Sequence, residues 1–395
     1  MIGATQRAAA LLLLVAAGCT QRTDLIPAPA IDLGGTTSLC SGLGEPIRLG
    51  SSCAGALAAN SLGRALCACS SIFLTGSLFT EDSGSGGPGP GSMGGGPGGP
   101  APAAAVASDG SIEVGGSVQI NGSLSAGAAG IGFDRTAEIL GSLRSAGSLA
   151  AMQLAAVSEV AYVAGDVLGR VVVNGTLYVS PDSSVMAPSD NNDIVRQTIA
   201  VDPPCGCDAG PIVDVGALVA AARSDNQDAV ALIDPTTLAN THGPTTFDLP
   251  CGSYYLPSLT SDDTLEVRVH GRSALYIDGD VSLADGLRVT LDDGAELDLL
   301  VAGDVTLSAG TLGAASAASV RLWLASTSLQ LGAGATLSAI VYAPSATLLG
   351  EGGVAATGAL FVDSIVTDGN VMLRFDSDVL ADGSVCGQPA VSPTF

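Results

Sequence analysis

Short alternations of Val, Ile and Leu with polar residues, separated by Gly and Asp-Gly, fill the chain from residue 106 to 386. This period-two pattern is typical of short β-strands. Similar blocks recur with starts 18 to 25 residues apart, among them 114–124, 139–149, 275–283 and 299–307. Such a period predicts one turn of a parallel β-solenoid, in which stacked turns share a core that no single turn could bury.

We therefore expect an all-β protein: a parallel β-helix (β-solenoid) with one inserted α-helix and a small Cys-bearing N-terminal segment. Changes in composition divide the chain into a signal peptide at 1–18, the N-terminal segment at 19–82, a Gly/Pro/Ser linker at 83–105, the solenoid at 106–386 with an insertion at 180–253, and a tail at 387–395.

The insertion contains one helical pattern, at residues 212–225, with Asp214 placed to cap its first turn. One face of this helix is apolar and consists of Val215, Leu218, Val219 and Ala222. We expect the helix to pack against an apolar surface of the solenoid.

The C-terminal coils supply such a surface. They align on an aliphatic column that we expect to point inward: Leu275, Leu299, Leu322, Ile340 and Leu360. The next position forms a second apolar column, which strand alternation turns outward: Tyr276, Leu300, Trp323, Val341 and Phe361. An exposed stripe of this size marks a covered or a binding surface. Either the helix covers it and buries Trp323, or it is a docking stripe for a partner or a sugar ring.

The first nineteen residues form a processing signal. Arg7 precedes an apolar run at 8–17 that is too short to cross a bilayer, which requires about 20 residues as a helix. The run ends in Ala-Ala-Gly-Cys19, which resembles the bacterial lipobox, in which the Cys becomes the lipid-modified N-terminus. We expect an exported protein anchored in the cell envelope, with the outer membrane or cell surface favoured. An ordinary secretory signal is the alternative.

Eight cysteines remain if Cys19 carries lipid, an even number that suits disulfides in an oxidising compartment. They form two sets of four, each with a C-x-C pair: Cys40, Cys53, Cys67 and Cys69, then Cys205, Cys207, Cys251 and Cys386. Neighbours at this spacing rarely bond each other. We expect each pair to bond the two distant cysteines of its own set; a four-thiolate zinc site is the competing interpretation.

Charge excludes one class of partner. Acidic residues outnumber basic ones by 38 to 14, and the net charge of −24 excludes a surface built to hold nucleic acid. Two histidines leave little room for His-based catalysis or metal sites. Turn capping by Asp is the interpretation we favour for the clustered Asp residues. Calcium binding is the alternative, at Asp190 and Asp193 or at Asp376, Asp378 and Asp382.

Carbohydrate-cleaving β-helices need two or three carboxylates that converge on one groove. The adjacent pairs Asp262-Asp263 and Asp292-Asp293 would face opposite sides of a strand or cap a turn, and His242 is typical of a loop. We expect no enzyme, no metal and no cofactor.

The C-terminal run 338–380 resembles an uncharacterised exported bacterial β-helical domain of surface lipoproteins and pilus-associated proteins. Tyr342-Ala343-Pro344, Gly358-Ala359-Leu360 and Phe375-Asp376 hold the places of that pattern, and the segments 205–222 and 250–256 are similar to its upstream part. The earlier coils are similar, more weakly, to the polymer-forming bactofilin solenoids. The resemblance implies a fold and an exported location, and no reaction.

These patterns together predict a lipid-anchored envelope β-solenoid with a structural or adhesive role. Its partners would be the membrane through the lipid, and an envelope protein or a polysaccharide. The alternative is a β-helix that binds or degrades polysaccharide. A groove lined by clustered Asp and aromatic residues would favour the alternative, and a plain acidic surface favours the first function.

We predict that Cys19→Ser abolishes lipid labelling and releases the protein in soluble form, because acyl chains, at about 0.8 kcal/mol per buried CH₂, are its only expected membrane anchor. Fractionation of cells labelled with a fatty-acid probe tests this. Membrane attachment that persists in the variant would contradict the lipoprotein prediction.

Overall fold

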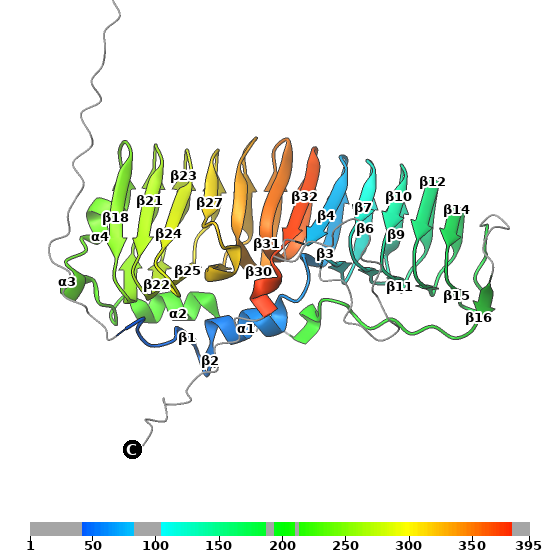
Figure 1. Cartoon of the computed structure of the whole chain (residues 1–395), viewed down its shortest axis with the longest axis horizontal. Helices are drawn as coiled ribbons and strands as arrows, with labels where there is room; N and C mark the ends of the chain where they lie inside the picture. Colours follow the sequence, from blue (N-terminus) through cyan, green and yellow to red (C-terminus); the bar gives the residue numbers. More distant parts are fainter. Residues whose placement is uncertain (1–41, 83–103, 187–192, 210–212, 381–395) are drawn as a thin grey trace, which may run out of the picture.

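The computed structural model describes residues 42–82, 104–186, 193–209 and 213–380. Parallel strands stack into one rod of about 13 turns, which confirms the β-solenoid (Figure 1). Each turn contributes to three flat faces, here called A, B and C, and every strand pairs with the strand of the same face in the next turn.

Face A contains β17 (Asn240–Thr241), β20 (Leu259–Ser261), β23 (Val281–Leu283), β26 (Val305–Leu307), β29 (Ser328–Leu331), β6 (Ser111–Val114) and β9 (Gly130–Phe133). Face B contains β18 (Thr245–Leu249), β21 (Leu265–Val269), β24 (Leu287–Leu291), β27 (Thr311–Gly313), β32 (Asn370–Phe375), β4 (Leu78–Asp82), β7 (Val118–Ile120) and β10 (Ala137–Ile139).

Face C contains β19 (Gly252–Leu256), β22 (Arg272–Ile277), β25 (Glu296–Val301), β28 (Val320–Leu324), β5 (Val106–Ser108), β8 (Leu124–Ala126), β11 (Leu143–Ser145), β13 (Ala161–Val163), β15 (Leu177–Val179) and β16 (Ile194–Arg196). Five longer strands pass round a corner and serve more than one face: β3 (Leu66–Leu74), β12 (Leu149–Val157), β14 (Val167–Val173), β30 (Thr336–Gly350) and β31 (Gly353–Thr367).

The turns do not follow one another in sequence order. The stack starts at β17, runs to β32, continues with β3 and β4, and ends at β16. We call the junction of β31 and β32 with β3 and β4 the seam. Residues 66–82 of the segment 19–82, which was expected as a separate unit, therefore supply a turn in the middle of the rod, and that expectation is wrong.

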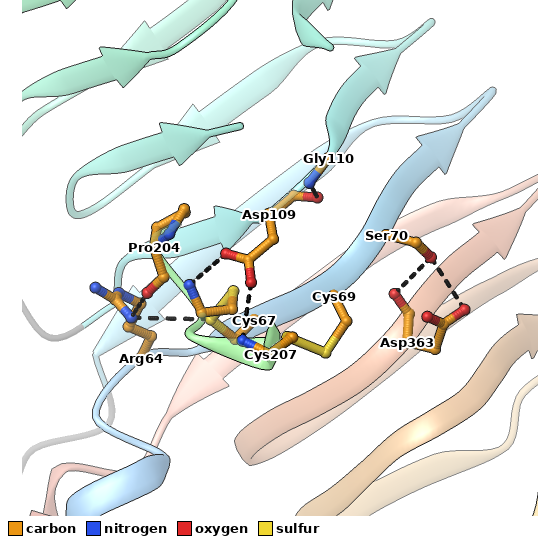
Figure 2. Close-up of a disulfide and its surroundings, with 11 residues drawn as sticks. Arg64, Cys67, Cys69, Ser70, Asp109, Gly110, Pro204, Cys207 and Asp363 are labelled. Atoms are coloured by element: carbon orange, nitrogen blue, oxygen red, sulfur yellow. Dashed lines mark hydrogen bonds between the residues drawn. A yellow bond between two sulfur atoms is a disulfide. The ribbon is translucent and has the colours of Figure 1, made fainter. Parts of the chain in front are cut away.

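The seam is paired like any other step of the stack. Leu66 lies opposite Leu360 and Leu78 opposite Val371, in parallel register. Side chains add further bonds: the Ser70 hydroxyl donates to the Asp363 backbone and carboxylate oxygens at 3.0 Å. Figure 2 shows this contact beside the cysteines of β3.

One corner of the rod is built from stacked glycines across the seam: Gly352, Gly369, Gly76 and Gly116. A Cβ on Gly76 would lie 2.1 Å from the Gly369 carbonyl oxygen, and one on Gly369 would lie 2.1 Å from the Gly352 carbonyl. Only glycine allows the turns to approach so closely here, on both sides of the seam.

A connecting segment carries the chain back from one end of the rod to the other. After β16, residues 197–209 run along the side of the stack, and the path continues through α2 (Val215–Ala222), α3 (Asp228–Ala231) and α4 (Pro235–Leu238) to β17 (Figure 1). We call residues 197–239 the strap. The expected insertion 180–253 is therefore not an interruption between neighbouring coils: it joins the two opposite ends.

The two ends of the rod are closed differently. At the first turn, the start of α3 and the residue before it mimic a further strand: Gln227 donates its backbone N–H to the Ser253 carbonyl, and the Asp228 carboxylate accepts from Tyr255 N. At the last turn, Arg196 stands in an inward column above Val179, and its guanidinium donates to the backbone carbonyls of Ser180, Pro181 and Ser183. Because Arg occupies a position that is apolar in the preceding turns, a further turn cannot stack on the core here.

The number of residues per turn differs between the N-terminal part of the rod, β3 to β16, and the C-terminal part, β17 to β32. The inward column of face C in the N-terminal part contains residues spaced by 16 to 19: Leu124, Leu143, Ala161, Leu177 and Ile194. The 24- and 25-residue steps that the sequence suggests for this part do not correspond to turns. In the C-terminal part Leu275, Leu299 and Leu322 are stacked as expected.

Two disulfides fasten the strap to the first turn beyond the seam. Cys67 bonds Cys205 and Cys69 bonds Cys207, both with Cα atoms 5.6 Å apart. These bonds cross between the two sets of cysteines, so the expected pairing within each set is wrong. The sequence concealed this because β3, from the first set, and the strap, from the second, meet only when the stack is assembled out of order.

Further cysteines take part in disulfides as well. Cys53 and Cys251 are disulfide-bonded, whereas Cys19, Cys40 and Cys386 lie outside the described residues. Asp109, at the corner after β5, accepts from the backbone N–H groups of Cys205 and Cys207 at 2.6 and 3.0 Å (Figure 2). The strap is therefore held by covalent and hydrogen bonds at the same place.

We predict that Gly76→Ala destabilises the protein by about 1–3 kcal/mol, because its methyl group would overlap the Gly369 carbonyl across the seam. Gly63→Ala is the matched control, since a Cβ there meets only Leu380 Cδ2, at 3.8 Å. Urea unfolding followed by circular dichroism compares them. Equal stability of the two variants would contradict the out-of-order stack.

Candidate functional site

The aromatic column expected on the outside of the C-terminal coils exists, with one correction. Tyr276, Leu300 and Trp323 are stacked in register, and the next members are Tyr342 and Phe361. Val341 instead lies opposite Leu322, in the inward column where Ile340 was expected. The turn from β28 to β30 is shorter than the turns before it, which shifted the alignment by one residue.

The column is covered. The exposed fractions of its side chains are 8% for Tyr276, 0% for Leu300, 1% for Trp323, 2% for Tyr342 and 4% for Phe361. Trp323, Tyr342 and Phe361 pack in series, with ring centroids 5.3 and 5.5 Å apart.

Helix α2 provides part of the cover. It packs on β19, β22 and β25 and buries Val215, Val219 and Ala222, while the Asp214 carboxylate caps it by accepting from Ala217 N at 2.9 Å. The expectation that this helix packs on the column is confirmed at β22 and β25, which carry Tyr276 and Leu300, and Trp323 is buried as expected; the alternative of an open docking stripe is wrong. Two helices not expected from the sequence, α1 (Ala54–Ser61) and η3 (Ser377–Leu380), contact each other on the same side of the rod (Figure 1).

A buried ionic network lies beside the column. Arg321 is 1% exposed and donates from Nε and Nη2 to the two carboxylate oxygens of Asp298, at 2.8 and 2.9 Å. It also pairs with Glu296, and the Trp323 indole N–H donates to Asp298 at 2.7 Å.

Arg321 keeps its charge in this network. Burial lowers the pKa of Arg321, but the carboxylates of Asp298 and Glu296 outweigh burial and raise it above the ordinary value. Both Asp298 and Arg321 occupy outward positions of strands, so only the cover removes them from water. The sequence gives one signal for this network: Asp298 and Arg321 are charged residues at outward positions of a face that is otherwise apolar.

The candidate catalytic groups do not converge. Asp262 accepts from Gly243 N and from His242 at 2.8 Å, in an exposed turn, and Asp263 accepts from Thr264 N at the start of the next strand. The two Asp residues therefore serve turns, as the sequence suggested.

His270 bridges three successive turns. Its Nδ1 lies 2.9 Å from Asp292 and its Nε2 lies 3.2 Å from Asp248, on the outer surface near face B. The hydrogen bond to Asp292 raises the pKa of His270; desolvation acts against it and Asp248 adds to it. Both ring nitrogens can donate only in the protonated form, so this group acts as a positive link between two carboxylates.

No set of three His, Cys, Asp or Glu side chains is arranged to hold a metal ion within the described residues. Asp376 accepts from Ala318 N at 3.1 Å and from Asp378 N at 3.1 Å, which is a turn-capping role. Asp190 and Asp382 lie outside the described residues.

The largest surface hollow among those described combines polar groups with a larger apolar lining. It has a volume of about 750 Å³ on face B and is lined by Thr264, Asp285, Arg288, Thr311, Ser316 and Ser338, among others. Thr264 donates to Asp285 at 2.9 Å, while Arg288 is exposed and has no ion-pair partner among the described residues. The hollow has hydroxyl groups suited to a polar ligand, and its lining contains no aromatic ring.

Comparison with known proteins matches one part of the chain. Residues 205–381 are similar to a family described as a domain of unknown function (DUF7305). No curated protein and no solved structure matches the chain significantly. The matched part spans the strap from Cys205 and the turns up to η3, so its first two cysteines bond residues of β3 that lie outside the match.

None of the helices in the described part of the chain has both the length and the hydrophobicity to cross a bilayer. Cys19 and the residues before it lie outside that part, and the lipid anchor stays a prediction.

We predict that Asp298→Asn destabilises the protein by about 3–5 kcal/mol, because Arg321 would keep its charge in a buried place without a full partner. Arg374→Ala is the control: its ion pair with Glu81 is more than half exposed and contributes about 0–1 kcal/mol. Denaturant unfolding measures both. A loss below about 1 kcal/mol for Asp298→Asn would show that the network is not sealed from water.

Proposed function

We propose that this chain is a lipid-anchored component of the cell envelope that works as a rigid structural or adhesive rod outside the membrane. The observation that carries the proposal is the continuous parallel stack, which is closed at the seam and fastened by disulfides between the strap and β3. A rod of this kind keeps its length and shape without a cofactor. The lipobox-like sequence at Cys19 supplies the anchor, and the cysteine usage suits an oxidising compartment.

The surface supports this role over polysaccharide cleavage or binding. Carbohydrate sites combine aromatic platforms with converging carboxylates, but the stacked aromatics from Tyr276 to Phe361 are buried beneath the cover. The largest described hollow has one Asp, one Arg and hydroxyl groups, and no ring. An acidic surface of Ser, Thr and Asp fits a solvated rod that presents its faces to partners.

The experiment compares cells that lack the protein with cells that produce the wild type or Cys19→Ser. We expect loss of the protein to reduce attachment to surfaces or resistance of the envelope to detergent, and the soluble variant not to restore it. Unchanged attachment and unchanged envelope resistance in the deletion strain would overturn the proposal.

A glycan screen of purified residues 20–395, the mature chain without the lipid-bearing Cys19, tests the alternative of a polysaccharide-binding protein. A fragment that starts at residue 106 is unsuitable, because β3 and β4 lie inside the stack. Glycan binding that is lost in Arg288→Ala and kept in Arg135→Ala, with or without calcium, would favour a polysaccharide-binding protein instead.

A further inference from the structure

Exposed apolar side chains gather on face A at the seam. The outward column of this face is polar in the first turns (Thr260, Ser282, Thr306 and Gln330) and then becomes apolar at Leu349, Val366 and Phe73. These three are 38%, 38% and 46% exposed, on three successive turns. An uncovered apolar column that follows four turns with polar outward residues indicates an interaction surface.

The same column then becomes hollow. After Phe73 come Glu113, Gly132 and Ala150, so two successive turns have almost no outward side chain. A Cβ on Gly132 would meet only Glu113 Cγ, at 3.9 Å, which shows open space. The resulting hollow has a volume of about 550 Å³, with Phe73 on one side and Met152, 82% exposed, on the other.

Two carboxylates border the hollow. Glu113 and Asp134 both line it and both are exposed. Neither side chain has a hydrogen-bond or ion-pair partner among the described residues, and the neighbouring Arg135 pairs with neither of them. The hollow therefore combines apolar walls with negative charge that no group in the described part of the chain pairs with.

The charge determines which occupant fits. A second copy would bring together two faces that each hold unpaired Glu113 and Asp134, on chains with a net charge of −24. An anionic ligand would meet the same repulsion. A cationic side chain fits, because the aliphatic stem of Arg or Lys can lie along Phe73 and Met152 while its charged end reaches the carboxylates.

We propose that the apolar column and the hollow together form a docking surface for a basic polypeptide segment of a partner protein, with apolar residues beside its Arg or Lys. Apolar residues of that segment would cover Leu349, Val366 and Phe73, and a cationic side chain would enter the hollow over Gly132. The proposal names a partner class for the envelope rod and in that sense rests on the proposed function. Its physical basis is independent of the anchor.

The test uses the mature chain and a synthetic peptide of Arg-Leu-Arg-Ser repeats, with binding measured by titration calorimetry. We expect binding that weakens with added salt, and a loss of about tenfold or more in Gly132→Leu, which fills the hollow, and in the double variant Glu113→Gln/Asp134→Asn. Peptides with Glu in place of Arg, or with Ser in place of Leu, should bind more weakly than the Arg-Leu-Arg-Ser peptide by about tenfold or more.

Matched controls separate this surface from general charge attraction. Glu138→Gln removes an exposed carboxylate from β10 on face B, and Thr306→Leu adds an outward Leu to a distant turn of face A. Both should bind the peptide as the wild type does, and circular dichroism checks that every variant is folded.

Three results would overturn the inference: no binding by the wild type, an equal loss in Glu138→Gln, or self-association of the chain that depends on Phe73. No peptide binding by the wild type, together with reduced attachment in the deletion strain, would reject this surface and leave the proposed envelope role standing. Normal peptide binding with no cellular defect in the deletion strain would reject the envelope role and leave this docking surface standing.

Discussion

The rod depends on backbone pairing between strands that lie about 293 residues apart in the chain, where β31 and β32 meet β3 and β4. Without this step the protein would be two shorter solenoids joined by the strap, each with an open end and an exposed core. With it, the aliphatic columns continue through the seam, from Leu360 to Leu66 and onward to Val106.

The cover on face C follows from the same topology. The strap runs along the rod from one end to the other. An apolar helix on this path is most stable against an apolar face, where both surfaces are removed from water. The column from Tyr276 to Phe361 provides that face, and α2 packs on it. The cover then allows Asp298 and Arg321 to be buried on the outside of a sheet, where they would otherwise be in water. Disulfides at Cys67 and Cys69 hold the strap in place beyond the seam.

Local patterns in the sequence predicted the elements well. The alternation of apolar and polar residues indicated the strands, the 23- and 24-residue steps placed Leu275, Leu299 and Leu322 in one column, and the pattern at 212–225 indicated α2 with its Asp214 cap. These features depend on neighbours within one turn of the chain or one helix. The single-residue error at Val341 arose where one turn is shorter than the others.

Long-range order could not be predicted in the same way. Nothing in the composition of β3, with the sequence Leu-Cys-Ala-Cys, indicates that its neighbour is β31, because the pairing of parallel backbones is the same for any aliphatic strand. The disulfide partners depend on the order of the turns in the stack, which the sequence does not show, and they were therefore predicted wrongly. The hollow at Gly132 was also missed, since it depends on which outward residues become neighbours: Phe73 comes from one side of the linker, and Gly132 and Ala150 from the other.

The seam also has a consequence for the order in which the protein folds. Synthesis delivers the N-terminal turns first, and β3 and β4 then present an unpaired edge, with N–H and C=O groups that await strands from near the other end of the chain. The last turns to be delivered are the ones that pair with this edge. Closure over such a separation is slow, because the entropy of the long intervening loop is lost before any contact compensates for it. The slowest step of folding should therefore be the joining of two finished halves, with a vulnerable edge exposed until it is complete.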